Sequence, residues 1–340
     1  MPRELVTLFD SNYLVKAVAM HRSLREVAGD DVRLHCCCFD DRAKRILDAL
    51  ALPGMRTFTV ADLEAGDPEL LAVKPTRSPT EYCWTSTPAL VRYVLDTCPE
   101  IDELTYVDAD LLFFSHPEAL FAEMGDDSIC IAPHRYATEY KAQEVNGIYC
   151  VQWNTFRRDQ RGLRALDWWR ERCLEWCYYR LEDGKLGDQK YLDDWPERFE
   201  GVHVLQHKGG GLAPWNVPSY DIHRAPGGAV MVDADPLVFF HYHRVSLREG
   251  GDHDWRPPGY AIGDDVHALV YEPYLRACDE ALALIRTVDP GFGAGLEPAR
   301  TLRERAQGLR ADAGSRAAAR WPWLLRVRYP KLRRPRSSSS

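Results

Sequence analysis

The sequence lacks several signals that would place it in a special class of protein. Its first residues, MPRELVTLFD, carry acidic side chains where a secretory signal would begin its apolar segment. No run of 18 apolar residues is present, so we expect no membrane-spanning helix. No internal repeat is visible, and the composition is that of an ordinary soluble globular protein.

Acidic residues outnumber basic ones outside the C-terminal end of the chain. The formal net charge is -8, yet residues 313–340 contain eight Lys or Arg and no acid. The rest of the chain is therefore strongly acidic. An acidic body argues against broad nucleic-acid binding, because the phosphate backbone requires a basic surface. A metal ion could still bridge such a body to phosphate groups.

The ten cysteines do not form a disulfide or zinc-binding pattern. Cys36, Cys37 and Cys38 are consecutive in an apolar, strand-like run, which is a poor geometry for bridges to one another. We interpret them as small core residues of a protein in the reducing cytosol. Cys173 and Cys177 are four residues apart on a predicted helix and could ligate a metal. Because no second Cys or His pair lies near them, a packed helix face is the favoured interpretation.

Apolar patterns with periods of two and of about 3.6 residues alternate along the chain. They predict strands at 5–9, 32–39, 55–60, 104–107, 128–133, 147–156, 202–206, 229–232 and 236–243. They predict helices at 13–24, 41–52, 84–95, 163–184 and 272–288. Such alternation favours an α/β fold with a largely parallel sheet covered by helices on both faces.

Two carboxylates, Asp108 and Asp110, follow the predicted strand 104–107. Residues two apart on an extended chain point to the same side, so both side chains can converge on one object. Two ionised carboxylates repel each other unless a cation lies between them, and oxygen ligands suit Mg²⁺ or Mn²⁺. Asp10 also follows a strand and is expected in the same crevice. The alternative is a strand-end turn with solvated acids.

Four stretches occur in one order between residues 3 and 245: LFDSNYLVKAVAMHRSL, TPALVRYVL, YVDADLLFFSHPEALF and GDQKYLDDW. Together they resemble the metal-dependent nucleotide-sugar glycosyltransferases of the GT-A fold, most closely glycosyltransferase family 8 and related bacterial enzymes. The resemblance implies a Rossmann-like mixed central sheet with helices on both faces over residues 1–260. A helical extension (261–312) and a basic, Trp-containing tail (313–340) would follow.

The resemblance also implies roles for residues that bind the sugar nucleotide. Asp10 and Tyr13 match the place where these enzymes hold the nucleotide base, although a helix cap and a core tyrosine are equally compatible with the sequence. Arg92 matches a basic residue near the diphosphate, or it simply pairs with the acid four residues later. Asp188 and Gln189 match the segment beside the reacting carbon of the donor sugar, where we expect the catalytic groups.

The predicted metal ligands are Asp108, Asp110 and His243, with His241 as a close alternative on the same face of a strand. The expected ion is Mn²⁺ or Mg²⁺. Lys208 precedes three glycines whose amides could approach phosphate, and it is predicted to offset the charge of the leaving diphosphate. A second Asp-x-Asp begins at Asp233, but the proline that follows it favours a turn.

The chain departs from the family where members often show an Asn-Ser-Gly stretch. Here the sequence reads YCVQWN, with Cys150 and Gln152 in that neighbourhood. The donor base, donor sugar, acceptor and stereochemical outcome therefore stay open, with UDP-sugars favoured over GDP-sugars and retention favoured over inversion.

The predicted function is transfer of a sugar to a glycan or lipid-linked acceptor in bacterial cell-surface polysaccharide synthesis. The alternatives are an inactive scaffold of the same fold and a metal-dependent phosphatase. No nucleic-acid partner is expected. We predict a cytoplasmic protein, with the tail 313–340 contacting the inner face of the membrane or simply solubilising the chain.

Overall fold

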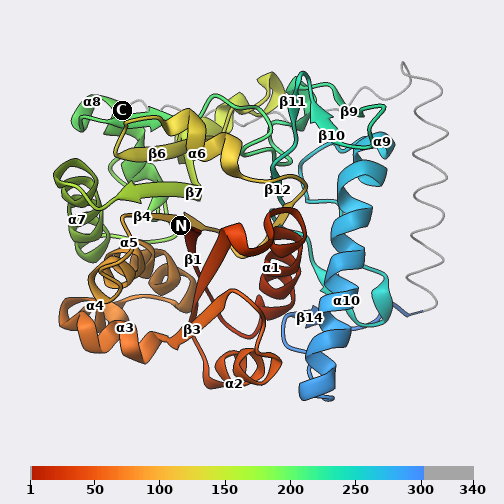
Figure 1. Cartoon of the computed structure of the whole chain (residues 1–340), viewed down its shortest axis with the longest axis horizontal. Helices are drawn as coiled ribbons and strands as arrows, with labels where there is room; N and C mark the ends of the chain where they lie inside the picture. Colours follow the sequence, from red (N-terminus) through yellow and green to blue (C-terminus); the bar gives the residue numbers. More distant parts are fainter. Residues whose placement is uncertain (1, 302–340) are drawn as a thin grey trace, which may run out of the picture. The chain divides into compact units, whose positions relative to one another are not determined.

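The computed structural model describes residues 2–301, and the central feature of this part is a mixed seven-stranded sheet (Figure 1). The strand order is β3-β2-β1-β4-β7-β6-β8. These strands are β1 (Arg3–Phe9), β2 (Val32–Cys38), β3 (Met55–Thr59), β4 (Glu103–Val107), β6 (Ile129–Pro133), β7 (Tyr149–Arg157) and β8 (Val202–Val204). All neighbours pair in parallel except β7, which is antiparallel to β4 and β6. The predicted mixed α/β sheet is confirmed.

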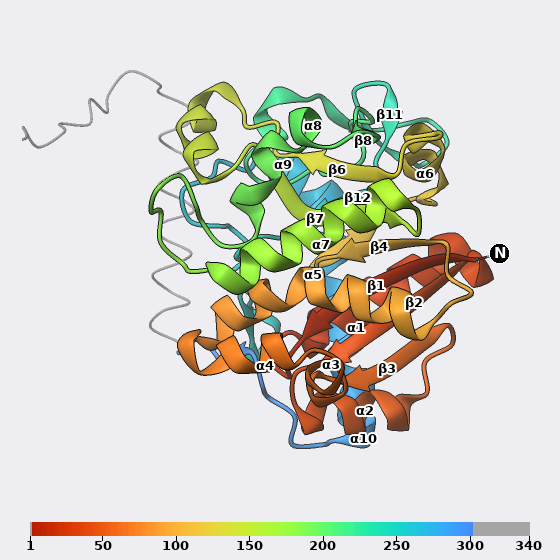
Figure 2. The ribbon, with the colours of Figure 1, turned by 90° about the vertical axis from the view of Figure 1, so that its left-hand side faces the viewer.

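Helices cover both faces of this sheet, as Figure 2 shows. One face carries α1 (Leu14–Ala28), α2 (Asp41–Leu50), α6 (Glu118–Met124) and α10 (Glu272–Val288). The other carries α3 (Val60–Gly66), α4 (Pro68–Val73), α5 (Pro79–Thr97), α7 (Gln160–Glu175) and α8 (Trp195–Arg198). Because both faces are covered, most side chains of the inner strands are buried, including polar ones such as Thr105 and Gln152.

The consecutive cysteines of β2 illustrate this two-sided burial. Cys36 and Cys38 belong to the core under α1 and α2, whereas Cys37 belongs to the core under α3 and α5. Successive strand residues point to opposite faces, so neighbouring thiols in this run face apart. They are small core residues, as the sequence predicted.

Residues 2–301 also form three small sheets and one further α-helix. They comprise β5 (Leu111–Phe113) with β12 (Phe239–His241), β9 (Ile222–Arg224) with β10 (Val230–Val232) and β11 (Asp235–Pro236), β13 (Leu247–Arg248) with β14 (Leu296–Glu297), and α9 (Asp264–Val266). Asp233 adopts a left-handed φ of 54° in the turn between β10 and β11. The predicted turn at the second Asp-x-Asp is therefore confirmed.

The predicted helix 163–184 is wrong at its C-terminal end, because α7 ends at Glu175. The guanidinium of Arg77 donates to the carbonyls of Cys173 and Leu174, at 3.4 and 3.0 Å. These carbonyls would accept the hydrogen bonds of the next helical turn, so a distant side chain stabilises the helix end. The segment that follows is free to run along the pocket described below.

Helix α10 is built into the core and lies beside α1 (Figure 1). Tyr274, Cys278, Ala281 and Ile285 form its buried stripe, with the spacing of an amphipathic helix. The ring of Tyr274 stacks on Tyr242, with centroids 3.6 Å apart and ring planes at 4°. This contact ties α10 to the segment that follows β12.

The predicted tail 313–340, and residues 302–312 of the predicted extension, lie outside the described residues. Within residues 2–301, none of the helices combines the length and the apolar character needed to cross a bilayer.

We predict that Tyr274→Ala destabilises the protein by about 3–5 kcal/mol, because it removes a large buried ring. Tyr274→Phe is the matched control: within the described residues the Tyr274 hydroxyl is buried and has no hydrogen-bond partner, so its removal should cost little. Urea unfolding of the two variants measures the difference. Equal stability of the Ala and Phe variants would show that α10 is not anchored through this ring.

Candidate functional site

A pocket of about 720 Å³ lies where β1 and β4 end, which is the usual position for ligands in open sheets of this kind. Its floor includes Asp10, Asp108 and Asp110, from the segments that follow these two strands. The remaining wall comes from α5, from residues 134–151 and 179–189, from the segment after β12, and from Trp215 and Tyr260. The predicted crevice that gathers the strand-end acids is therefore present.

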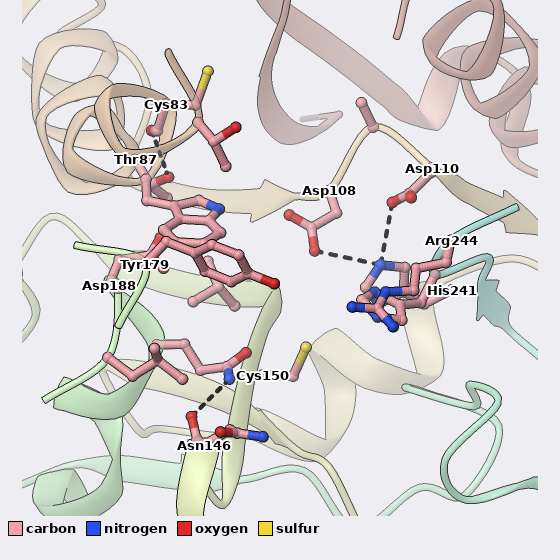
Figure 3. A pocket seen from close by; sticks show the side chains of 18 of the residues that line it. Cys83, Thr87, Asp108, Asp110, Asn146, Cys150, Tyr179, Asp188, His241 and Arg244 are labelled. Atoms are coloured by element: carbon pink, nitrogen blue, oxygen red, sulfur yellow. Dashed lines mark hydrogen bonds and ion pairs between the residues drawn. The ribbon is translucent and has the colours of Figure 1, made fainter. Parts of the chain in front are cut away.

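His241 lies against both carboxylates of the Asp-x-Asp, although it is far from them in sequence (Figure 3). Its Nε2 is 3.2 Å from Asp110 Oδ1 and 3.8 Å from Asp108 Oδ2. The antiparallel pairing of β5 with β12 produces this contact, because it sets His241 opposite Leu111. The backbone N–H of Tyr242 also donates to the carbonyl of Asp110, at 3.0 Å.

The predicted ligand His243 also lines the pocket, but its neighbours are aromatic. Its ring centroid is 5.6 Å from that of Trp215 and 6.0 Å from that of His241. Burial, and then the charge on His241, lower the pKa of His243 to about 4. The geometry thus favours His241 over His243 as the metal ligand. The sequence prediction had given His241 as the alternative to His243.

Burial and neighbouring charges shift the pKa values of His241, Asp110 and Asp108 in different directions. Burial lowers the pKa of His241, but Asp110 and Asp108 outweigh this effect and raise that pKa well above its usual value. Burial alone would raise the pKa of Asp110, yet the charge of His241 and that of Lys16 hold it well below its usual range. Burial raises the pKa of Asp108 to about 6, with His241 opposing the rise and Asp110 adding to it.

Two buried side chains support the carboxylates from behind. The Nζ of Lys16, on α1, is 4.0 Å from Asp110 Oδ2, and the hydroxyl of Tyr106 donates to Asp108 Oδ1 at 3.2 Å. The backbone N–H of Asp108 donates to the carbonyl of Gln152, at 3.3 Å. Both carboxylates are therefore fixed in position before any ligand arrives.

The donor groups at this end of the pocket fit a divalent cation. Two carboxylates converge on one point, and the His241 imidazolium occupies the place of the cation that such a pair requires. Among the described residues, one group of three potential metal ligands lies close enough together to share an ion. One ligand atom each from Asp108, Cys150 and His241 lies within 4.8 Å of the other two. Asp110 is not in that group, although its Oδ1 lies 3.2 Å from His241 Nε2 and its Oδ2 4.0 Å from Lys16 Nζ.

Asp188 and Gln189 lie on another wall of the pocket, as Figure 3 shows for Asp188. The backbone carbonyl of Asp188 accepts from the Trp169 indole at 2.9 Å, and the Gln189 amide donates to the carbonyl of Asn146 at 3.0 Å. Burial, and then the charge of Asp108, raise the pKa of Asp188 to about 7. The pocket thus also holds a carboxyl group whose pKa is raised, whereas that of the similarly buried Asp110 is lowered.

Asp10 and Tyr13 line the pocket, as the sequence predicted for the base-binding pair. The Asp10 carboxylate accepts hydrogen bonds from the backbone and side chain of Asn12, at 2.9 and 2.8 Å, and so shapes the turn after β1. Tyr13 is 44% exposed, which leaves its ring available to a ligand. The ring also has the Lys16 ammonium 4.6 Å from its centroid.

The structure places the two predicted phosphate-binding cations outside the pocket. Arg92 pairs with Asp96 and Asp167 on the helical surface, at 3.0 and 3.5 Å. Lys208 pairs with Asp233 at 2.7 Å. The glycines beside Lys208 are buried: a Cβ on Gly209 would lie 1.9 Å from a backbone oxygen and one on Gly210 2.7 Å from a leucine side chain, so packing explains them.

Sequence reasoning missed Arg244, which lines the pocket beside the histidines (Figure 3). Its φ of 61° is left-handed, which is uncommon for a long side chain and typical of functional sites. Arg244 forms no hydrogen bond or ion pair with any residue in the range 2–301. The signal in the sequence was a cation directly after His-x-His.

We predict that Asp188→Asn stabilises the metal-free protein at pH 8 but not at pH 4. The folded-state pKa of Asp188, about 7, exceeds the unfolded value, so its ionisation costs stability as pH rises from about 4 to 7. The expected gain at pH 8 is on the order of 2–4 kcal/mol, measured by urea unfolding with chelator present. Asp194→Asn, at a half-exposed acid of the same segment, is the control. An unchanged pH slope in the Asp188 variant would contradict the prediction.

The protein is similar to two curated proteins in sequence and to a solved glycosyltransferase in structure. No family model matches the sequence. The uncharacterized protein YfnF of Bacillus subtilis (strain 168) is 32% identical over 296 residues, which cover 84% of this chain and 95% of YfnF. The uncharacterized protein YfnD of the same organism is 29% identical over 298 residues, which cover 86% of this chain and 94% of YfnD.

The galactosyltransferase LgtC, solved in complex with donor and acceptor sugar analogs, superposes with a TM-score of 0.53 and 16% identity. The match covers 82% of this chain and 95% of LgtC. At this identity it establishes the fold alone, and membership of glycosyltransferase family 8 itself stays a prediction. The chain belongs to the same family as YfnF, and its fold is the GT-A fold of nucleotide-sugar glycosyltransferases.

Proposed function

We propose that this protein is a metal-dependent glycosyltransferase that moves a sugar from a nucleoside-diphosphate donor to a glycan or lipid-linked acceptor. The observation that carries the proposal is the convergence of Asp108, Asp110 and His241 at one end of a pocket in a GT-A fold. A nucleotide-sugar site requires carboxylates that can hold a cation and an adjacent pocket that can hold the ligand. Both are found here.

The diphosphate end of the donor belongs beside these acids. Asp108 and His241 would hold Mn²⁺ or Mg²⁺, with Asp110 paired to His241 behind them. The ion would act as a Lewis acid that neutralises charge developing on the diphosphate leaving group. Arg244 would add a positive charge beside the ion and take the role that the sequence suggested for Lys208. Tyr13 offers a ring face to the base, for which uracil is favoured and guanine is the alternative.

The sugar belongs near Asp188 and Gln189. The Trp169 indole holds the backbone of Asp188, and the carbonyl of Asn146 holds the Gln189 amide, so this segment is fixed beside the place proposed for the reacting carbon. A buried carboxyl with a raised pKa can donate or accept a proton near neutral pH. We favour a hexose donor and a retaining outcome, in line with the family 8 resemblance.

The acceptor belongs at the mouth of the pocket, where aromatic side chains are exposed. Tyr179 is 67% exposed, lines the pocket and packs edge-on against Trp84, at 5.2 Å between ring centroids. Leu181 is 50% exposed beside it. Such a surface suits the apolar face of a sugar ring. We propose that the acceptor is a cell-surface polysaccharide precursor made at the cytoplasmic face of the membrane.

We predict that UDP raises the melting temperature of the wild-type protein in the presence of Mn²⁺, with GDP as the alternative. Binding at 100 times Kd should stabilise the fold by about 2.7 kcal/mol. The metal-dependent part of the shift should vanish in His241→Ala and persist in His243→Ala, which tests the choice between these histidines. If no nucleotide changes the melting temperature and no donor is hydrolysed, the result would contradict the transferase proposal and favour the inactive scaffold.

We predict that Arg244→Ala weakens UDP binding about tenfold or more in the presence of Mn²⁺, because it removes a charge-assisted hydrogen bond to phosphate. Lys208→Ala is the matched control and should bind UDP as the wild type does, since its ammonium is paired with Asp233. Isothermal titration measures both affinities. A larger loss in the lysine variant than in the arginine variant would reverse the assignment.

A further inference from the structure

Cys150 lies beside the carboxylate and imidazole that are proposed to hold the metal. Figure 3 shows its sulfur directed toward Asp108 and His241. One ligand atom from each of these three residues lies within 4.8 Å of the others. The Cys150 residue is only 4% exposed, and the His241 residue 7%, with its Nδ1 lacking a hydrogen-bond partner among the described residues.

An irregularity in the sheet brings Cys150 to this place. The pairing of β6 with β7 jumps at one step, from Ile131 opposite Asn154 to Ala132 opposite Cys150. A bulge of this kind re-aims side chains and is common beside active sites. The bulged segment also supplies the Gln152 carbonyl that accepts from the backbone of Asp108. The same backbone feature therefore positions both the thiol and the carboxylate.

The other cysteines have a different setting. Cys36, Cys37 and Cys38 are fully buried among the apolar side chains of the two main cores. Cys83 lines the same pocket from α5 but does not belong to the group formed with Asp108 and His241. Cys150 also belongs to a small buried cluster with Ala213 and Trp215. Among the described residues, however, it is the cysteine whose sulfur lies within 4.8 Å of a carboxylate oxygen and an imidazole nitrogen.

A sulfur ligand changes which ion a site prefers. Mg²⁺ binds oxygen and keeps several waters, whereas thiolate and imidazole ligands suit later first-row ions such as Co²⁺ and Zn²⁺. We propose that the Cys150 sulfur is a ligand of the divalent ion, together with Asp108 and His241, and that the site prefers Co²⁺ or Zn²⁺ to Mg²⁺. The inference rests on the proposed function, because it requires an ion at Asp108.

The test is a titration of chelator-treated protein with Co²⁺, followed by absorption spectroscopy. Cobalt bound to protein gives visible d–d bands, and a cobalt–sulfur bond adds a charge-transfer band in the near ultraviolet. We expect both in the wild type. Cys150→Ser should lose the charge-transfer band and bind Co²⁺ about tenfold or more weakly, at least the loss seen for supporting residues of metal sites. Cys83→Ser, in the same pocket, should keep the band.

The outcomes separate this inference from the proposed function. Visible bands without a charge-transfer band in the wild type overturn sulfur ligation and leave a metal-dependent transferase intact. A charge-transfer band that survives Cys150→Ser but disappears in Cys83→Ser also overturns it. Ready displacement of Co²⁺ by an equal concentration of Mg²⁺ overturns the stated metal preference. Absence of all cobalt bands, together with no metal-dependent effect of nucleotides, overturns both proposals.

Discussion

Two carboxylates held side by side at the edge of a core repel each other, and the arrangement of this protein follows from how that repulsion is balanced. The segment after β4 carries both acids, and a strand from much later in the chain brings His241 between them. Lys16, from the helix after β1, approaches Asp110 from the other side. The site is therefore assembled from three separate parts of the sequence, each of which supplies charge that the others require.

The surrounding fold keeps this charged cluster in place and gives it access to ligand. The hydrogen bonds of β5 to β12 fix His241, and the stacking of Tyr242 on Tyr274 anchors the same segment to α10. Early termination of α7 releases the segment that forms part of the pocket wall. If α7 continued to Gly184, the residues after Glu175 would be helical and could not line the pocket as they do. The Arg77 contact at the end of α7 therefore also shapes the site.

Much of the fold was predictable from local pattern. The alternation of apolar strands and amphipathic helices predicted the α/β sheet, and Pro236 after the second Asp-x-Asp predicted the turn at Asp233. The end of α7 was not predictable, because apolar residues continue at helical spacing and the group that ends the helix, Arg77, lies far away in sequence. The antiparallel orientation of β7 was not predictable either, because the residues of a strand do not indicate the direction in which it pairs.

For the site, the sequence by itself determined the pair of acids, their position after a strand and the two candidate histidines, because strand periodicity and carboxylate repulsion are local properties. Only the tertiary structure decided which histidine meets the acids, since that depends on the register between β5 and β12. It also placed Arg92 and Lys208 in surface ion pairs and brought Arg244 and Cys150 into the pocket. Those positions depend on turns, bulges and strand pairing, which join residues that are distant in the chain.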